Sequence, residues 1–317
     1  MRNLRPFLTP ALVVLVVLLF SVTQDSAYRI QLGTLAAIYA LAAIGLTLLF
    51  GGAGQISLGQ AAFMGVGAFV TAGLSVDHGL SPWLAGPLGV VLATAIGVLV
   101  GWSALRLTGH YLALSTLALG LMFTEAMRTV YPDGWYGVPA LTFFGYDLTQ
   151  PRRFLLLTWA IVVIALVLAS LMVRSRFGRS LAAVRDDPLA AASCGVDIAR
   201  AKVVIFAIAA GLGGVAGSLF AVYQGSVTET PFSFGLSFNL MIMVVIGGLG
   251  SPLGAVLGAV FLVLVPEFGR DYEQYRLLGY GLVLILVLAL LPGGLASLRG
   301  LSRRLEPSMR RLRRAGP

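Results

Sequence analysis

The sequence predicts an all-α integral membrane protein that crosses the bilayer about ten times, with some of its helices broken. Hydrophobic residues make up 58% of the 317 residues, charged residues only 11%, and the mean hydropathy is +0.92. Apolar runs repeatedly reach the ~20 residues that a helix needs to cross about 30 Å of hydrocarbon. Lys and Arg gather in a few segments between these runs. A soluble globular protein with a polar surface is therefore excluded.

Ten apolar runs follow one another along the chain. The first has a basic start and could be taken for a signal peptide, but no small-residue cleavage site stands out after it, so we expect a helix there. The predicted spans are residues 7–24, 30–50, 56–76, 83–105, 110–130, 153–173, 202–223, 234–250, 252–266 and 276–292.

Two junctions between these spans have almost no loop. Residues 51–54 are rich in glycine, and Ser251 is followed by Pro252. Each junction is either a tight turn between two spans or an interruption within a broken helix that does not cross fully. Pro252 lacks an amide donor and the glycines favour unwinding, so the freed backbone groups need partners from protein or from a water-filled cavity. A count of eight to eleven spans fits these alternatives.

The placement of charge predicts the orientation. An even number of spans puts both termini on one side, and the positive-inside rule favours the cytoplasm, because 16 of the 22 Lys/Arg then lie inside. We expect one transmembrane domain over residues 1–298, which includes a cytoplasmic loop at 174–202, and a basic cytoplasmic tail at 299–317. The tail is either mobile or lies against anionic lipid headgroups. This distribution describes membrane topology and excludes a nucleic-acid partner.

Small residues at helical spacing indicate close helix packing in the apolar runs. The glycines and the proline that we assign to packing or to helix breaks are Gly51, Gly52, Gly54, Gly250, Pro252, Gly254 and Gly258. Packing does not explain Gln55, Ser57 and Gln60, which fall where hydrocarbon should surround the chain. Such groups are costly in a membrane unless they bond across helices or face water. They are candidates for a translocation pathway or for an interhelical clamp, and the sequence favours neither.

The 174–202 loop has helical signals of its own. Residues 178–192 can form one or two short helices, because Asp186 and Asp187 precede Pro188 as at a helix start and Gly195 can end the helix. Such a helix could rest on the membrane or dock into a groove on another protein.

Catalytic motifs are absent from the sequence, so we expect no enzyme. It contains no nucleotide-binding GxxxxGK[ST], no HExxH and one cysteine, Cys194. We therefore expect no cofactor or metal site in this chain. Glu125 fits a structural or interfacial acid better than a proton carrier, so energy for uphill transport would come from another subunit.

Four blocks, in order, resemble the permease subunit of bacterial branched-chain amino-acid ABC transporters. They are GGAGQISLGQAAFMGVGAF (51–69), ALRLTGHYLALSTLALG (104–120), RSRFGRSLAAVRDDPLAAASCGVD (174–197) and MVVIGGLGSPLGAVLGAVFLVLVPE (243–267). The likeness extends from about residue 30 to residue 294. It implies a multi-pass protein of the bacterial cytoplasmic (inner) membrane. Its partners would be a second permease subunit, two cytoplasmic ATPase subunits that bind the ATP, and an extracytoplasmic substrate-binding protein.

The resemblance also implies a role for the 174–202 loop. Ala190, Ala191 and Gly195 match the A-A-x-x-x-G core of the segment that ABC importers insert into the ATPase, whereas Leu189 replaces the acid that often opens this motif. The residues expected to contact the ATPase, in the groove or at its rim, are Arg179, Arg185, Asp186, Asp187, Pro188, Ala190, Ala191 and Gly195.

The substrate is the least determined part of the prediction. Many relatives carry a Gly- and Asn-rich outer loop where this chain has the shorter, more aromatic YPDGWYGVPALTFFGYDL. Branched-chain or other hydrophobic amino acids fit best, with urea, short amides or other amino acids as alternatives within the family. The alternative of another class is a self-sufficient secondary transporter or channel, in which Glu125 and His110 would matter.

Overall fold

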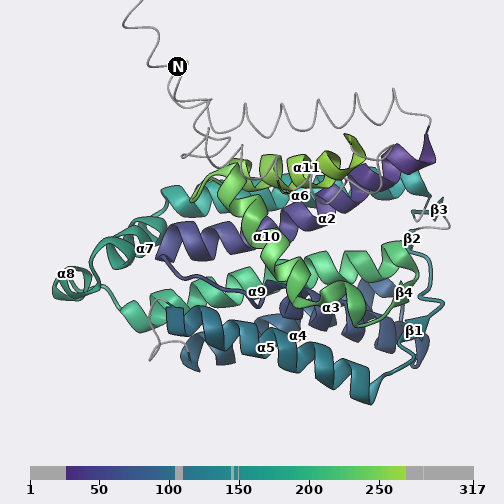
Figure 1. The fold of residues 1–317 in the computed structure, drawn as a ribbon, viewed down its shortest axis with the longest axis horizontal. Helices are drawn as coiled ribbons and strands as arrows, with labels where there is room; N and C mark the ends of the chain where they lie inside the picture. Colours follow the sequence, from purple (N-terminus) through teal and green to yellow (C-terminus); the bar gives the residue numbers. More distant parts are fainter. Residues whose placement is uncertain (1–25, 104–109, 144–145, 149, 269–280, 282–317) are drawn as a thin grey trace, which may run out of the picture.

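The structure is a computed structural model that describes residues 26–103, 110–143, 146–148, 150–268 and 281. Long helices lie roughly side by side, with short strands at one end of the molecule and two short helices at the other (Figure 1). The elements, in chain order, are α2 (Ala27–Thr47), the π-helix η1 (Leu48–Gly52), α3 (Gln60–Val76), α4 (Pro82–Ser103), α5 (His110–Val130), β1 (Trp135–Tyr136), β2 (Thr142–Phe143), β3 (Tyr146–Asp147), α6 (Pro151–Arg174), α7 (Arg176–Asp186), α8 (Pro188–Ser193), α9 (Ile198–Gln224), β4 (Ser226–Val227), the 3-10 helix η3 (Thr230–Phe232), α10 (Phe234–Gly247) and α11 (Pro252–Phe268).

The all-α, multi-span class predicted from the sequence is confirmed. Helix α5 begins and ends at the predicted residues, and α4, α6 and α9 differ from the prediction by at most four residues at either end. Among the described residues, four helices are long and apolar enough to cross a membrane, namely α2 with η1, α4, α6 and α9, and the bent pair α10–α11 would make a fifth if it is one span. The predicted spans 7–24 and 276–292 lie outside the described residues, so the count of about ten stays a prediction.

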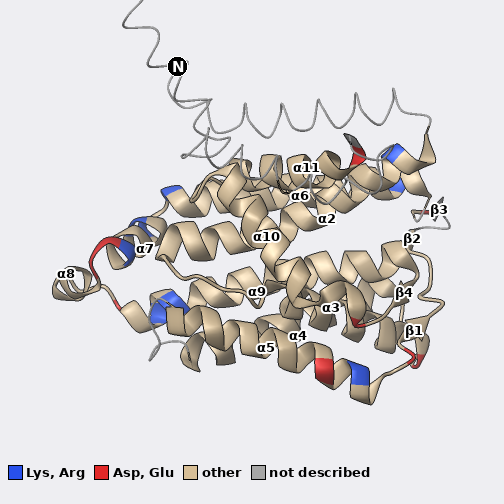
Figure 2. Cartoon of the chain, viewed as in Figure 1, with Lys and Arg blue, Asp and Glu red and all other residues tan. Residues whose placement is uncertain are grey.

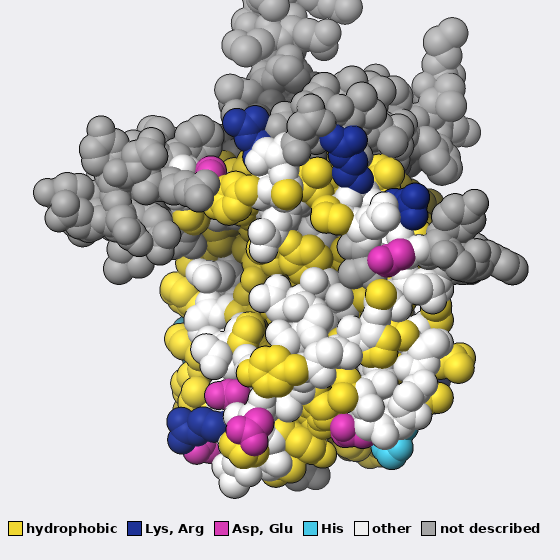
Figure 3. Space-filling model, turned by 90° about the vertical axis from the view of Figure 1, so that its right-hand side faces the viewer, with side chains coloured by type: hydrophobic (Ala, Val, Ile, Leu, Met, Phe, Trp, Pro, Cys, Tyr) yellow, Lys and Arg dark blue, Asp and Glu magenta, His cyan; other side chains and the backbone are white. Residues whose placement is uncertain are grey.

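Charged side chains gather at the two ends of the molecule and leave a belt of uncharged residues between them (Figure 2). The end that carries α7 and α8 has six described Lys/Arg and three acids, whereas the strand end has four Arg and six acids. Seen end-on, the strand end shows charged groups with apolar side chains exposed between them (Figure 3). Because charge is costly within hydrocarbon, the long axis of the helices is the direction in which the chain crosses the membrane.

Helices α3, α4 and α9 pack with their backbones in contact. A Cβ added at Gly67 would overlap the carbonyl oxygen of Gly214, and one added at Gly217 would overlap that of Met64. Beside these contacts, the buried hydroxyl of Thr71 donates to the Ser218 hydroxyl at 2.9 Å. The small residues therefore serve close helix packing here, as the sequence indicated.

The strand end is joined by residues from distant parts of the chain. Strands β1 and β4 pair antiparallel, with Trp135 opposite Val227. The indole nitrogen of Trp135 donates to Asp77, which follows α3, at 2.9 Å. The ring of Phe69 meets those of Trp135 and Phe232 edge-on at centroid distances of 5.6 and 6.1 Å. These contacts hold the ends of α3, α5 and α9 together.

Helical structure is interrupted at both junctions that lacked a loop. Helix α2 ends in the π-turn η1, and α3 begins only at Gln60, four residues later than predicted, because residues 54–59 are not helical. Helices α10 and α11 are bent by 120° at the second junction. The far end of α11 returns to the strand end, where the Tyr28 hydroxyl donates to Glu267 at 2.6 Å.

Candidate functional site

The two helix breaks touch each other. A Cβ added at Gly51 would overlap the amide nitrogen of Gly250, so the backbones of the η1 turn and of the α10–α11 bend are in direct contact. Gly250 has a φ of +81°, which glycine adopts without strain. Gly51 and Gly250, 199 residues apart in the chain, thus bring the end of η1 and the α10–α11 bend together, and we use the name break junction for residues 51–54 and 248–252.

The α10–α11 bend is held by contacts between its own arms. A Cβ at Gly247 would overlap the carbonyl oxygen of Gly254, and one at Gly258 would overlap that of Met243. The hydroxyl of Ser251 accepts a hydrogen bond from the Gly254 amide at 3.1 Å, which satisfies one of the free amides at the start of α11. Pro252 occupies the first position of that helix, where its missing amide costs least.

Helices α7 and α8 form at the positions that the sequence indicated. The Ser175 hydroxyl caps α7 by accepting from the Gly178 amide, and Asp187 caps α8 by accepting from the amides of Leu189 and Ala190. After α8 the chain turns at Gly195, whose φ is +81°. These caps fix the α7–α8 segment as a compact pair of helices projecting from one end of the molecule (Figure 1).

The two helices differ in what they bury. Helix α7 is amphipathic and buries Leu181 and Val184 against the rest of the chain. Helix α8 buries Ala191 but leaves Leu189 exposed to 81%. Helix α7 is therefore anchored to the rest of the helix bundle, while α8 presents an apolar tip outward.

Arg185 connects α7 to the break junction. Its Nη1 donates to the carbonyl oxygen of Gly51 at 2.7 Å. A Cβ at Gly54, whose φ is +67°, would stand 2.9 Å from Arg185 Cγ, so the arginine stem lies directly over this turn. The guanidinium also donates from Nε to Asp186 Oδ1 at 3.1 Å.

A cavity of about 280 Å³ lies between α7 and the break junction. Thr47, one of its lining residues, is 1% exposed, and its Oγ1 has no hydrogen-bond partner among the described residues. The lining residues are Thr47, Leu48, Gly51, Gly52, Met172, Val173, Gly178, Arg179, Leu181, Ala182, Arg185, Leu249 and Gly250.

The three buried polar residues near the first break have different surroundings. Gln60 donates from Nε2 to the carbonyl oxygens of Ala42 at 3.3 Å and Ala209 at 2.9 Å, so it bridges α3, α2 and α9. The Ser57 hydroxyl accepts from the nearby Gly59 amide at 3.4 Å. Gln55 is 4% exposed, and neither of its amide atoms has a hydrogen-bond partner among the described residues. Gln60 thus has the geometry of a clamp through its Nε2, although its Oε1 has no partner among these residues, whereas both amide atoms of Gln55 are unused.

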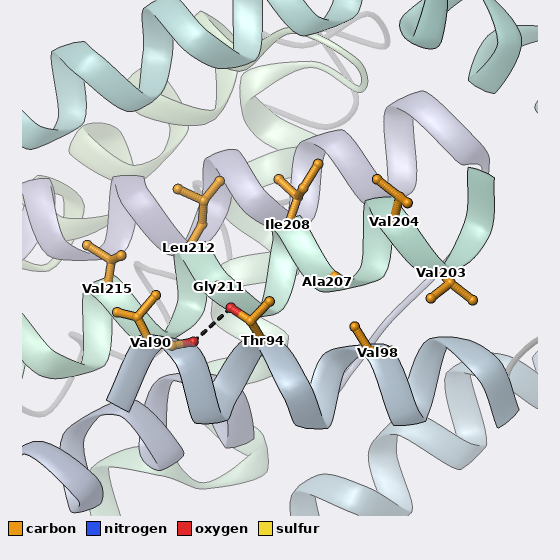
Figure 4. Close-up of a pocket in the computed structure, with 10 residues that line it drawn as sticks. All are labelled: Val90, Thr94, Val98, Val203, Val204, Ala207, Ile208, Gly211, Leu212 and Val215. Atoms are coloured by element: carbon orange, nitrogen blue, oxygen red, sulfur yellow. Dashed lines mark hydrogen bonds between the residues drawn. The ribbon is translucent and has the colours of Figure 1, made fainter. Parts of the chain in front are cut away.

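A second hollow lies away from these residues, in the groove between α4 and α9 (Figure 4). Its volume is about 370 Å³, and nearly all its wall is aliphatic. Thr94 turns its hydroxyl back to the Val90 carbonyl at 2.7 Å, as Figure 4 shows, and so offers little to a polar solute. The groove suits contact with hydrocarbon or an apolar surface.

Residues 28–291 match the protein family described as branched-chain amino acid transport system / permease component. The chain belongs to this family. Among curated proteins, it is 32% identical to the high-affinity branched-chain amino acid transport system permease protein LivM of Salmonella typhimurium and to that of Escherichia coli, over 91% of this chain and 74% of each relative. It is 27% identical to the permease protein LivH of Escherichia coli, over 83% of this chain and 92% of the relative. No solved structure matches it.

This permease brings together some of the predicted site residues and separates others. Arg179 and Arg185 line the same cavity as Gly51, Gly52 and Gly250. Sequence reasoning missed the direct Gly51–Gly250 and Arg185–Gly51 contacts. It also missed two partners of backbone amides around the start of α3. The Leu58 amide donates to the Thr116 hydroxyl at 2.9 Å, and the Ala61 amide donates to that of Ser237 at 3.0 Å. Thr116 stands next to Ser115, and Ser237 is four residues from Ser233, so the sequence offers no signal that sets either hydroxyl apart.

Proposed function

We propose that this chain is the membrane subunit of an ATP-driven importer for branched-chain or other hydrophobic amino acids. The observation that carries the proposal is the family match over residues 28–291, together with the role of the LivM relatives in branched-chain amino acid transport. Urea, short amides and other amino acids are the competing substrates within the family.

The α7–α8 end faces the cytoplasm in this proposal. The excess of Lys/Arg at that end, six against three acids, supports the assignment, because positive residues are retained on the cytoplasmic side during insertion. The strand end then faces outward, and the chain resides in the bacterial inner membrane with both termini inside. The strand end would receive substrate from an extracytoplasmic binding protein.

The α7–α8 segment is the proposed contact for a cytoplasmic ATPase. Leu189 is exposed to 81% on a helix of six residues, and the acids Asp186 and Asp187 stand beside it. A small apolar tip with a charged rim suits insertion into a groove on a partner. The full assembly would hold this chain, a second permease subunit, two ATPase subunits that bind the ATP, and the binding protein. This chain would hold no cofactor and perform no catalysis.

Transport would follow from a switch between two packed arrangements. Closure of the ATPases on ATP would displace α7 and α8, and the permease would open its pathway to one side or the other. Gln55, Ser57 and Gln60 are the proposed pathway residues, and Gln55 is the strongest of them because its amide is buried and unused.

Glu125 weighs against a self-sufficient secondary transporter. Its carboxylate pairs with Arg128 at 2.8 Å, and the two side chains are 63% and 64% exposed. A carboxylate that carries a coupling proton usually lies inside the helix bundle or a water-filled cavity. The placement of Glu125 suits an interfacial ion pair instead.

Vesicle uptake with the whole assembly tests the proposal. Leucine, isoleucine, valine, aromatic amino acids and urea would be compared with and without ATP inside the compartment that holds the ATPases. We expect saturable uptake of the branched-chain amino acids that requires both ATP and the binding protein. Full uptake by this chain without the ATPases would contradict the proposal, and preferential uptake of urea would change the substrate while preserving the mechanism.

A further inference from the structure

We propose that Arg185 acts within this chain, as the positioning residue that links the α7–α8 segment to the break junction. The inference rests on the proposed function and deepens it, because it names the contact through which a displaced α7 acts on the transmembrane helices. Arg185 therefore differs from the other charged residues of the segment, whose expected role is at the ATPase surface.

The partner of Arg185 is a carbonyl that a helix break has set free. Helix α2 and η1 run together over Ala27–Gly52, and the last turn closes with the amides of Gly54 and Gln55 donating to Phe50 and Leu49 at 3.0 and 3.2 Å. The next carbonyl, that of Gly51, accepts from the Arg185 guanidinium at 2.7 Å. A cation is favoured there because the C-terminal end of a helix carries partial negative charge.

The contact continues from Gly51 into the second break. Because the Gly51 backbone lies against Gly250, a displacement of Arg185 reaches the α10–α11 bend through one intervening residue. Leu181 of the same helix lies beside Gly52, 3.8 Å from where its Cβ would stand. Helix α7 therefore holds the break junction with one polar contact and one apolar contact.

Two other arginines, Arg179 of α7 and Arg200 at the start of α9, bond locally. Arg179 donates to the Arg174 carbonyl at 3.3 Å, and Arg200 pairs with Asp197 at 3.0 Å. Arg185 instead bonds a residue 134 positions away. Its neighbour Asp186 cannot fix its position, because the two side chains are 69% and 45% exposed and such a pair contributes little.

The cavity beside this contact gives α7 room to shift. A cavity of about 280 Å³ lies beside the Arg185 contact, and the buried hydroxyl of its lining residue Thr47 has no hydrogen-bond partner among the described residues. A buried polar group without a partner is destabilising, so a second arrangement that pairs it would offset part of the cost of moving the helix. The contact thus lies at a place where two packings are accessible.

The test uses the whole assembly in vesicles, with Arg185→Ala, Arg185→Lys and the charge-matched control Arg200→Ala. Cys194, the only cysteine of the chain, and an added cysteine in Leu249→Cys carry spin labels, with cysteine-free partner subunits. In Arg185→Ala we expect the ATPases to stay bound and to hydrolyse ATP, while uptake falls by about tenfold, within the range that one coupling residue can change. The distance distribution between the labels should broaden.

The other variants separate the possible roles. Arg185→Lys should recover part of the uptake, since an ammonium group can still donate to the Gly51 carbonyl. Arg200→Ala should stay within about twofold of the parent chain, because it removes only an exposed pair. Loss of bound ATPase in Arg185→Ala would overturn the inference in favour of a surface contact, as would unchanged uptake with an unchanged label distance. If the parent assembly shows no ATP-dependent uptake, the proposed function fails, and the label distances still decide whether Arg185 holds the segment.

Discussion

Glycine has different roles in the α3–α4–α9 bundle and in the break junction. In the bundle, Gly67 and Gly217 lie within unbroken helices and let two backbones approach while every helical hydrogen bond is kept. At the junction, Gly51 and Gly250 lie where helices stop, so close approach comes together with free backbone groups. The comparison shows that a small residue permits contact, whereas the hydrogen bonds around it determine whether the contact is rigid or can rearrange.

The largest effect is expected in the bundle. Gly217→Ala would place a methyl group on the Met64 carbonyl in a helix pair with no room to separate. We expect a loss of about 2 kcal/mol in the free energy of unfolding, the usual cost of overpacking, measured by thermal unfolding in detergent. Gly86→Ala is the matched control, because its Cβ would meet Ser218 Cβ at an ordinary 3.7 Å. Equal stability of the two variants would show that the bundle is as adaptable as the junction.

A smaller loss of stability and a larger loss of coupling are expected at the junction. Gly51→Ala would overlap the Gly250 amide and force the two breaks apart, whereas Gly52→Ala has its nearest neighbour, Leu181, at 3.8 Å. We expect Gly51→Ala to lower the free energy of unfolding by about 1 kcal/mol and to abolish most ATP-dependent uptake. Gly52→Ala should be close to the parent chain in both measurements. If Gly52→Ala lost more uptake than Gly51→Ala, the contact between Gly51 and Gly250 would be contradicted.

The two glutamines next to the junction extend the comparison to polar groups. Gln60→Leu removes two hydrogen bonds between helices and should cost about 1 kcal/mol of stability. Gln55→Leu removes an amide without partners and should leave stability unchanged or raised. If Gln55 lies on the pathway, its variant loses uptake although it is well folded. Normal uptake by the Gln55 variant would remove it from the pathway.

The smallest effect belongs to a residue outside both regions. Glu125→Gln breaks an exposed pair with Arg128 and should change stability by less than about 0.5 kcal/mol, with uptake unaffected. A pH-dependent loss of uptake in this variant would instead favour a proton-coupled carrier. Uptake measured across a range of pH decides between the two.

Regular helices were predicted from the sequence more accurately than the junction. The hydropathy pattern predicted both ends of α5 at the residues where the structure has them, because the boundaries of this helix depend on local composition. It placed the start of α3 four residues early, because hydropathy does not register that Thr116 supplies a partner to the non-helical Leu58 amide and Ser237 one to the first turn of α3. The glycines and Pro252 marked both breaks, but their mutual contact joins segments far apart in the chain. The same limit hid the role of Arg185, whose charge suggested only a surface residue.

The pairing of β1 with β4, reinforced by Trp135 and Phe69, fastens the strand end across the bundle. The η1 turn and the α10–α11 bend, which contact each other, lie away from these strands. We expect the helices to be held more rigidly at the strand end than at the opposite end, where α7 and α8 lie. Amide hydrogen exchange should therefore be slower in the paired strands β1 and β4 than in residues 54–59, which are not helical.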